Sequence, residues 1–334
     1  MTSLATDFTS LAGIDLPIVQ APIGSATTPE LAAAVSNAGG LGLLSLTWRS
    51  PNEARELIRQ TKALTDRPFG INLVLLWDAA ERLTIALEEG VPIISLSWGD
   101  PGPWIEQIHE AGALLVHMVG STAEAIGAKL AGADAIVAQG YESAGHVEGQ
   151  TGIMALLPEM IDAIAPTPVL AAGGIGDGRG LAAALCLGAS GAWMGTRFLL
   201  STEADAHPEY QQWLVDAGAS STTYTTLFRG GWPPHTPLRT LPNKTLQLWE
   251  EAGRPEPGRG PGEGDVIGQT SRGVAIIRYH DDFPGAHTTG DLQSMVLYAG
   301  ESVGVMHEIL PAGEIVRNVA DQARSVLSRL GSEG

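Results

Sequence analysis

The chain has 334 residues, 44% hydrophobic and 17% charged, and its 19 basic and 37 acidic residues give a net charge of −18. This composition excludes a disordered polymer, which contains few apolar residues and much charge. The 42 glycines follow no three-residue period, which excludes collagen. An acidic surface repels phosphate backbones and anionic lipids, so we expect no nucleic-acid partner and no membrane partner.

The N-terminal residues lack a basic stretch followed by an apolar one, and no window reaches about 18 uninterrupted apolar residues. The sequence therefore predicts neither a signal peptide nor a membrane span. Its single cysteine, Cys186, excludes an internal disulfide and is typical of a reducing compartment. Because Cys186 lies in the apolar run 181–188, we expect a buried structural thiol. The protein is predicted to be cytoplasmic.

From residue 17 to about residue 200, short apolar runs alternate with segments of helical period. The runs predict eight strands, at residues 17–22, 41–46, 69–75, 91–98, 114–119, 133–139, 168–172 and 190–198. Helices are predicted between them at residues 29–39, 51–64, 79–89, 104–111, 122–130 and 180–187, with one more after the glycine-rich loop 140–152.

Glycines at the ends of the predicted helices supply the left-handed cap that turns a helix back into a parallel strand; they are Gly39, Gly90, Gly112, Gly132 and Gly188. Strands that are apolar throughout are typical of a parallel sheet covered on both faces. Eight such units predict an α/β fold, a closed (β/α)8 TIM barrel over residues 1–215. A doubly wound open sheet is the structural alternative.

Residues 216–312 have a different character, because they are rich in Pro, Gly and Thr, as in GGWPPHTP, and contain one strand-like run at 274–279. A long irregular insertion in a compact enzyme is usually a lid or a substrate-covering segment. A flexible surface loop is the alternative, and Trp232 and Trp249 favour packing. Residues 313–334 predict an amphipathic C-terminal helix packed on the barrel.

Two glycine clusters follow the last two predicted strands, at the ends where a barrel holds its active site. The first includes Gly173 and Gly174, and the second is the stretch Trp193-Met194-Gly195-Thr196. Without side chains, backbone N–H groups can approach a phosphate closely. The clusters therefore favour a phosphate-bearing ligand, with tight turns as the alternative.

A further glycine-rich loop, QGYESAGHVEGQTG, follows the sixth predicted strand and carries His146. A histidine at this position can contact a planar ligand and exchange protons near neutral pH. His117, on the fifth predicted strand, either points into the barrel mouth or is a satisfied interior histidine. No spacing of His, Cys, Asp or Glu is typical of a metal site, so no metal is expected.

These motifs together resemble the nitronate monooxygenase family, formerly called 2-nitropropane dioxygenases, which are FMN-dependent (β/α)8 enzymes. The similarity includes AQGYESAGHVEG and PVLAAGGIGDGRGLAAALCLGASGAWMGTRF. It extends to QAPIGSATTPELAAAVSNAGGLG near the start, to FGINL, and to LYAGESVG near the end, so it covers most of the chain.

The resemblance implies a catalytic base at His146. It also implies flavin contacts along the first strand end, at the Asn of FGINL, at the Gln of QGYE and along the glycine-rich stretches. These residues are Ala21, Pro22, Ile23, Gly24, Asn72, Gln139, Ala144, Gly145, Gly173, Gly174, Trp193, Met194, Gly195 and Thr196.

One residue departs from the family pattern. The usual E-A-G-G-H is Glu142-Ser143-Ala144-Gly145-His146 here, so alanine replaces a glycine that contacts the flavin. If Ala144 needs a positive φ, its methyl group strains the loop by about 1 kcal/mol or more; if its φ is negative, the change is mild.

The resemblance implies oxidation of alkyl nitronates, and by extension of nitroalkanes, with FMN and O2, giving a carbonyl compound and nitrite. The expected substrate pocket comprises Trp48, Trp98, His117, Tyr298 and Ser302. The alternative is an FMN-dependent NAD(P)H oxidoreductase, similar to enoyl-acyl carrier protein reductases or quinone reductases. A flavin-binding protein without turnover also stays open, as does a homo-oligomer, because exposed helical faces of barrels often pair.

Overall fold

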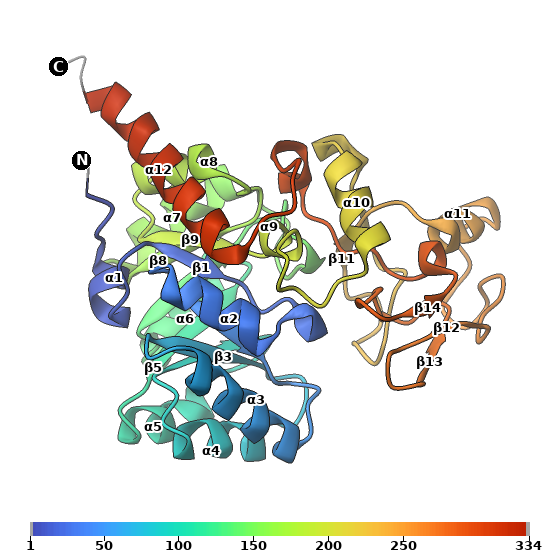
Figure 1. The fold of residues 1–334 in the computed structure, drawn as a ribbon, viewed down its shortest axis with the longest axis horizontal. Helices are drawn as coiled ribbons and strands as arrows, with labels where there is room; N and C mark the ends of the chain where they lie inside the picture. The colour runs from blue at the N-terminus through green and yellow to red at the C-terminus, as the bar shows by residue number, and fades with distance from the viewer. Residues whose placement is uncertain (1–2, 332–334) are drawn as a thin grey trace.

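The computed structural model describes residues 3–331, and its centre is an eight-stranded parallel sheet with the strand order β1-β9-β8-β6-β5-β4-β3-β2. A parallel bridge between Val19 and Leu41 joins the two end strands and closes the barrel (Figure 1). The predicted (β/α)8 barrel is therefore confirmed. Its strands are β1 (Ile18–Gln20), β2 (Gly42–Ser45), β3 (Phe69–Val74), β4 (Ile93–Ser97), β5 (Leu114–Val119), β6 (Ala135–Gln139), β8 (Val169–Ala172) and β9 (Gly191–Met194).

Helices cover the outside of the barrel. They are α2 (Pro29–Asn37), α3 (Pro51–Leu64), α4 (Ala80–Glu88), α5 (Gly102–Glu110), α6 (Thr122–Ala131), α7 (Ile153–Ile164) and α8 (Gly178–Cys186), and α1 (Asp7–Ala12) precedes the first strand. Local sequence explains their ends: Ser50 and Glu53 form a capping box around Pro51 at the start of α3. The five glycines expected after helices all have positive φ, between 66° and 113°.

Alternation along the strands divides the buried residues into two layers. One side chain set fills the barrel interior, and includes Leu43, Val116, Val137, Leu170 and Trp193. The other set packs between the sheet and the helices. This alternation decides which residues near the strand ends can face the centre of the barrel.

The eighth strand is shorter than predicted. β9 ends at Met194, and Thr196, Arg197 and Phe198 belong to the short helix α9 (Thr196–Leu199). An apolar run alone does not distinguish a strand from a buried helix, which explains the error.

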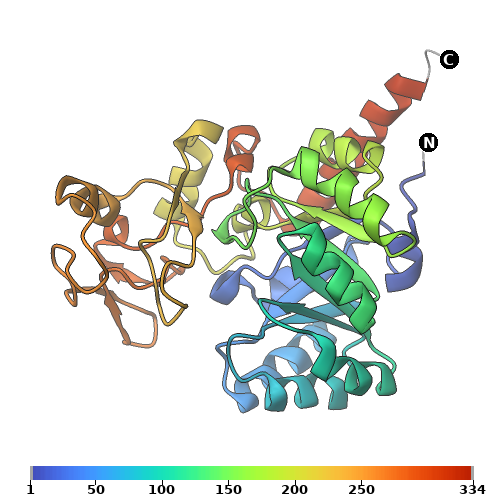
Figure 2. The same ribbon diagram turned by 180° about the vertical axis from the view of Figure 1, so that it is seen from behind.

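The 216–312 segment lies to one side of the barrel and is more regular than expected (Figures 1 and 2). Its strands β10 (Thr223–Thr225) and β11 (Leu238–Thr240) form a three-stranded sheet with β7 (Gly145–His146), which comes from the loop after β6. A second three-stranded sheet consists of β12 (Val266–Gln269), β13 (Ala275–Ile277) and β14 (Thr289–Gly290). The segment also contains α11 (Lys244–Glu251), while α10 (Pro208–Asp216) crosses the boundary expected at 215/216. Strands this short leave no readable alternation, and the domain boundaries stay a prediction.

The C-terminal helix α12 (Ala312–Gly331) packs against α8 and α2. A Cβ on Gly178 would overlap the α12 backbone at Val319, so glycine permits this close packing. The prediction that Cys186 is buried is wrong, because this residue is exposed. Cys186 is the last residue of α8 and does not belong to the buried face of that helix. Among the described helices, none is long and apolar enough to cross a membrane.

Candidate active site

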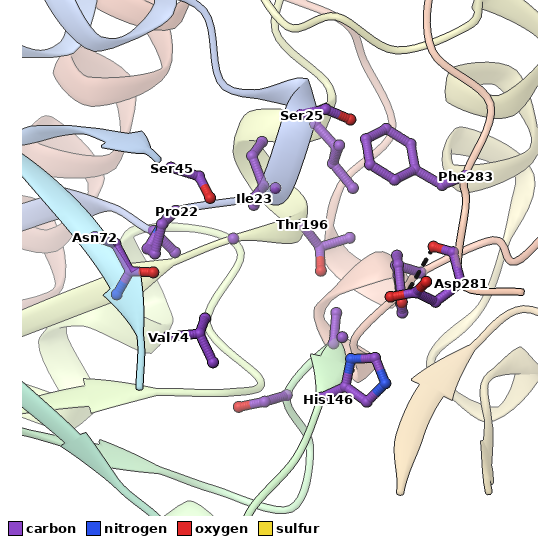
Figure 3. Close-up of a pocket in the computed structure, with 18 of the residues that line it drawn as sticks. Pro22, Ile23, Ser25, Ser45, Asn72, Val74, His146, Thr196, Asp281 and Phe283 are labelled. Carbon is purple, nitrogen blue, oxygen red and sulfur yellow. Dashed lines mark hydrogen bonds between the residues drawn. The ribbon is translucent and has the colours of Figure 1, made fainter. Parts of the chain in front are cut away.

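A cavity of about 700 Å³ lies at the carboxyl ends of the barrel strands, between the barrel and the 216–312 segment. Of the residues expected to form the site, these line it: Ala21, Pro22, Ile23, Gly24, Trp48, Asn72, Trp98, Gln139, Ala144, Gly145, His146, Gly173, Gly174, Trp193, Gly195, Thr196, Tyr298 and Ser302. Figure 3 shows Asn72, Ser45 and Pro22 across the cavity from His146 and Asp281.

His117 and Met194 were expected in the site but do not line the cavity. His117 lies beside Leu96 and Ile136 in the strand register, and both belong to the layer between sheet and helices. Met194 belongs to the same layer. The two-residue period of a strand therefore turns both side chains away from the barrel interior. Burial also lowers the pKa of the His117 imidazole to about 4.

The cavity floor carries small polar side chains that point inward from neighbouring strands. Asn72 is buried and donates from Nδ2 to Ser95 Oγ at 3.1 Å, which fixes its amide in the wall. Gln139 donates from Nε2 to the His146 carbonyl at 3.0 Å and accepts the Glu148 N–H at 2.9 Å. Gln139 thus holds the loop of His146 in place.

Glycines form the wall at the ends of β8 and β9. Gly173 and Gly174 have φ of 105° and 70°, a backbone conformation that L side chains rarely adopt. A Cβ on Gly173 would lie 2.7 Å from Ser143 Oγ and 3.2 Å from the Gly140 carbonyl oxygen. These glycines are therefore required by backbone shape, and they leave bare peptide groups facing the cavity.

Ala144 occupies the position where the family usually has glycine. Within residues 3–331, the non-glycine residues with positive φ are Trp98, His235, Arg254 and Tyr279, so Ala144 adopts an ordinary negative φ. The neighbouring Gly145 carries the positive φ, at 72°. The alanine is therefore the mild one of the two cases.

His146 was expected in a glycine-rich loop, but it lies in the short strand β7. This strand pairs with β11, and His146 lies opposite Leu238. Its side chain lies at the cavity wall, the residue is 9% exposed, and its buried Nε2 has no hydrogen-bond partner in the described structure. Burial lowers the pKa of the His146 imidazole to about 3. The ring is therefore uncharged at neutral pH, and its Nε2 is a buried polar atom without a partner.

Sequence reasoning assigned Trp232 only to packing and gave Asp281 no role. The Trp232 indole stacks on the His146 ring at a centroid distance of 3.7 Å and an interplanar angle of 19°. Its Nε1 donates to Asp281 Oδ2 at 2.9 Å. The GGWPP stretch, with two glycines before the indole and two prolines after it, was the available signal.

Glu148 was also missed. Its carboxylate accepts the N–H of Trp98 at 2.9 Å, and Trp98 has a φ of 59°, an outlier for a bulky residue. Burial raises the pKa of the Glu148 carboxyl to about 8, and the nearby charge of Glu124 adds to the shift. This buried acid helps to hold an indole of the cavity wall in a strained conformation.

Comparisons with known proteins show the family of the chain. A family model described as nitronate monooxygenase matches residues 5–322. A nitronate monooxygenase of Paraburkholderia phytofirmans is 32% identical, over 96% of this chain and 95% of that protein. A (3aS,4S,5R,7aS)-5-hydroxy-7a-methyl-1-oxo-octahydro-1H-indene-4-carboxyl-CoA dehydrogenase of Mycobacterium tuberculosis is 40% identical, over 71% of this chain and 67% of that protein.

Among solved structures, FabK from Thermotoga maritima has a TM-score of 0.84 and 32% identity, with 98% of this chain and 99% of that chain covered. A nitroalkane oxidase from Streptomyces ansochromogenes has a TM-score of 0.77 and 29% identity, covering 97% of this chain and 99% of that chain. The fold, the motifs and these similarities lead to one conclusion: the chain belongs to the nitronate monooxygenase family and is a flavin-dependent oxidoreductase.

Proposed function

We propose that this enzyme binds FMN in the central cavity and oxidises alkyl nitronates, and nitroalkanes after deprotonation, with O2 to a carbonyl compound and nitrite. The observation that carries the proposal is His146: an uncharged, buried imidazole with an unpartnered Nε2, in the wall of a glycine-lined cavity.

The residues present fit FMN. A volume of about 700 Å³ lies within the range of about 300–1,000 Å³ that small-molecule cavities occupy. The phosphate would lie at Gly173, Gly174 and Gly195, because bare peptide groups after the last two barrel strands suit an anion. Asn72 and the Ala21–Gly24 strand end would hold the flat ring system. When bound, FMN supplies the redox chemistry that transfers electrons from the substrate to O2.

The chain itself supplies the base. His146 takes the α-proton of a neutral nitroalkane at a ring nitrogen, and a base that is already neutral needs no prior loss of a proton. Because burial disfavours the imidazolium, we expect the anionic nitronate to accept a hydrogen bond from a neutral N–H of His146 rather than to form an ion pair with an imidazolium. Trp98, Trp232 and Tyr298 exclude water around this ring, which strengthens each polar contact inside.

His146→Asn tests the assignment. Removing the base is expected to lower kcat/KM for a neutral nitroalkane by about 10²–10⁴-fold, and to leave most of the activity with the preformed nitronate, which needs no deprotonation. Oxygen uptake and nitrite release measure both. His109→Asn is the matched control, since His109 is an exposed histidine paired with Asp134 at 2.9 Å. An unchanged rate with nitroalkane in the His146→Asn enzyme contradicts the role.

A second candidate function is an FMN-dependent oxidoreductase that takes electrons from NAD(P)H. The 40% identity to the dehydrogenase and the TM-score of 0.84 to FabK favour it. Anaerobic mixing of the flavoprotein with NADH, NADPH and propionate-3-nitronate in parallel distinguishes the two. Bleaching of the flavin by the nitronate alone supports the proposal, and bleaching by a nicotinamide nucleotide supports the second candidate.

A further inference from the structure

One face of the His146 imidazole is covered by a side chain from a distant part of the chain. Trp232 stacks on it at 3.7 Å and 19°, which is nearly parallel contact, and Trp232 itself is 8% exposed. His146 belongs to the barrel's own sequence and Trp232 to the 216–312 segment. The stack therefore brings the barrel and the 216–312 segment into contact at His146.

Three loops of the barrel hold Trp232 in this position. Trp48, Trp77 and Trp98 follow β2, β3 and β4, and their rings lie 6.3, 4.9 and 5.2 Å from the Trp232 ring. The contacts of Trp77 and Trp98 with Trp232 are edge-to-face, a geometry that contributes about 0.5–1.5 kcal/mol each beyond burial, and Trp48 lies tilted against the same ring. Four of the chain's eight tryptophans thus form one cluster beside His146.

Asp281 and the glycines before Trp232 fix the orientation of the indole. The Asp281 carboxylate accepts the indole N–H at 2.9 Å, and a Cβ on Gly230 would overlap that carboxylate. Gly230 and Gly231 have positive φ, and the proline after Trp232 restricts its backbone to extended conformations. The sequence GGWPP therefore allows the backbone conformation that places the Trp232 indole on His146.

Charged groups near His146 are already engaged. From β11, Arg239 pairs with Glu301 at 3.1 Å; Asp281 binds the indole; Tyr298 donates to the Asp281 carbonyl; and Glu148 binds the Trp98 N–H. The pKa of His146 is lowered by burial, with no charged neighbour as a cause. What shields the imidazole from water is therefore the apolar cover, and Trp232 is its largest stacked part.

We propose that Trp232, fixed by Asp281, is the positioning residue of His146: it covers one face of the imidazole, keeps water from it, and leaves the base to be approached from the cavity. The inference rests on the proposed role of His146 as base. It gives the GGWPP stretch a function in setting the protonation state of that base.

The test is an NMR titration of the flavin-loaded enzyme labelled with ¹⁵N-histidine, with His146 assigned by the signals lost in His146→Asn. In the wild-type enzyme we expect the ¹⁵N shifts of His146 to stay those of a neutral imidazole down to pH 5. In Trp232→Ala, water reaches the ring and the pKa should rise above 5, towards the ordinary value of about 6.5. The acid limb of the nitroalkane pH profile should move upwards with it.

Two variants separate the cover from other effects. Trp232→Phe keeps an aromatic ring on His146 without the indole N–H, and should keep the imidazole neutral at pH 5. Trp249→Ala removes a tryptophan of the same segment that bonds to Pro255 and does not line the cavity, and should also leave His146 unchanged. A wild-type pKa near 6.5, or an unchanged pKa in Trp232→Ala, overturns the proposal.

Chemical modification gives a second measurement if Trp232→Ala folds poorly. Acylation by diethyl pyrocarbonate at pH 7, mapped by peptide mass spectrometry, should be at least ten-fold slower at His146 than at the exposed His235 in the wild-type enzyme. Equal rates contradict the cover. If His146 is protected but His146→Asn keeps its nitroalkane activity, the proposed reaction fails while the cover stands; if the reverse holds, the cover alone fails.

Discussion

The barrel and the 216–312 segment contribute different side chains to one cavity. The barrel gives the glycines after β8 and β9, the polar side chains of Asn72 and Gln139, and the rings of Trp48, Trp98 and Trp193. The 216–312 segment gives the rings that lie beside His146, which are Trp232 and Tyr298.

The division between the two regions is not clean, because His146 itself connects them. Its strand β7 leaves the barrel sequence and pairs with β11 of the 216–312 segment. His146 is thus held by Gln139 from the barrel side and by β11 and Trp232 from the other side. We therefore expect cofactor binding to depend mainly on the barrel, and the protonation state of His146 to depend on both regions.

The first prediction tests the barrel's contribution to the cavity wall. Gly173→Ala places a Cβ 2.7 Å from Ser143 Oγ and demands a φ of 105° from alanine, so the wall must shift. We expect at least a ten-fold weaker affinity for FMN, measured as flavin retained after gel filtration and by fluorescence titration. Gly112→Ala is the control, since Gly112 has a φ of 73° but open space around it. It should lose about 1 kcal/mol of stability and keep its flavin; equal flavin loss in both variants would mean that strain alone is responsible.

The next effect concerns the buried acid behind the cavity wall. The pKa of Glu148 is raised from 4.5 to about 8 in the folded state, so the native protein binds the proton more tightly than the unfolded chain does. The stability from this proton is therefore fully present below about pH 4.5, is lost progressively between about pH 4.5 and pH 8, and is gone above that range, a loss of roughly 5 kcal/mol at most. Glu148→Gln removes this loss while keeping an acceptor for the Trp98 N–H.

Thermal unfolding at pH 5 and pH 9 measures the difference. We expect Glu148→Gln to match the wild-type enzyme at pH 5 and to have the higher Tm at pH 9. Glu124→Gln removes one cause of the raised pKa of Glu148 and should reduce the pH dependence only in part. If Glu148→Gln is less stable than the wild type at pH 9, the carboxylate is a net stabilising group there.

The sequence predicts the helices and strands of the barrel better than those of the 216–312 segment. The helix at 51–64 and the strand at 114–119 match α3 and β5 to the residue, because long periodic segments with caps carry their own signal. β10 to β14 have two to four residues each, and β11 pairs with β7, which lies far away in the chain. The strand-like run at 274–279 contains β13, whereas the other four strands are too short for periodicity to reveal them.

The candidate site shows the same limit. Residues next to strand ends, such as Asn72 and Gly173, line the cavity, because a barrel brings all its strand ends together. His117 was predicted to line the pocket, but its side chain points to the outer face of the sheet. Alternation shows which residues of a strand share a face, but the register is needed to decide which face points inward. The stack of Trp232 on His146 joins residues 86 positions apart, and no local pattern connects them.

The smallest effects lie at the contacts between the two regions. Arg239 of β11 is buried and bonds the Tyr141 carbonyl at 2.9 Å and Glu301 at 3.1 Å, whereas Arg272 of the same segment is exposed and pairs with Glu53 on α3. Arg239→Met leaves the part-buried Tyr141 carbonyl without its donor and the Glu301 carboxylate without its ion pair, so we expect a loss of about 2 kcal/mol. Arg272→Gln breaks an exposed pair and should cost less than about 0.5 kcal/mol. Urea unfolding of both variants measures the free energies; a loss for Arg272→Gln as large as that for Arg239→Met would mean that the outer ion pair, and not the β7–β11 contact, fastens the 216–312 segment to the barrel.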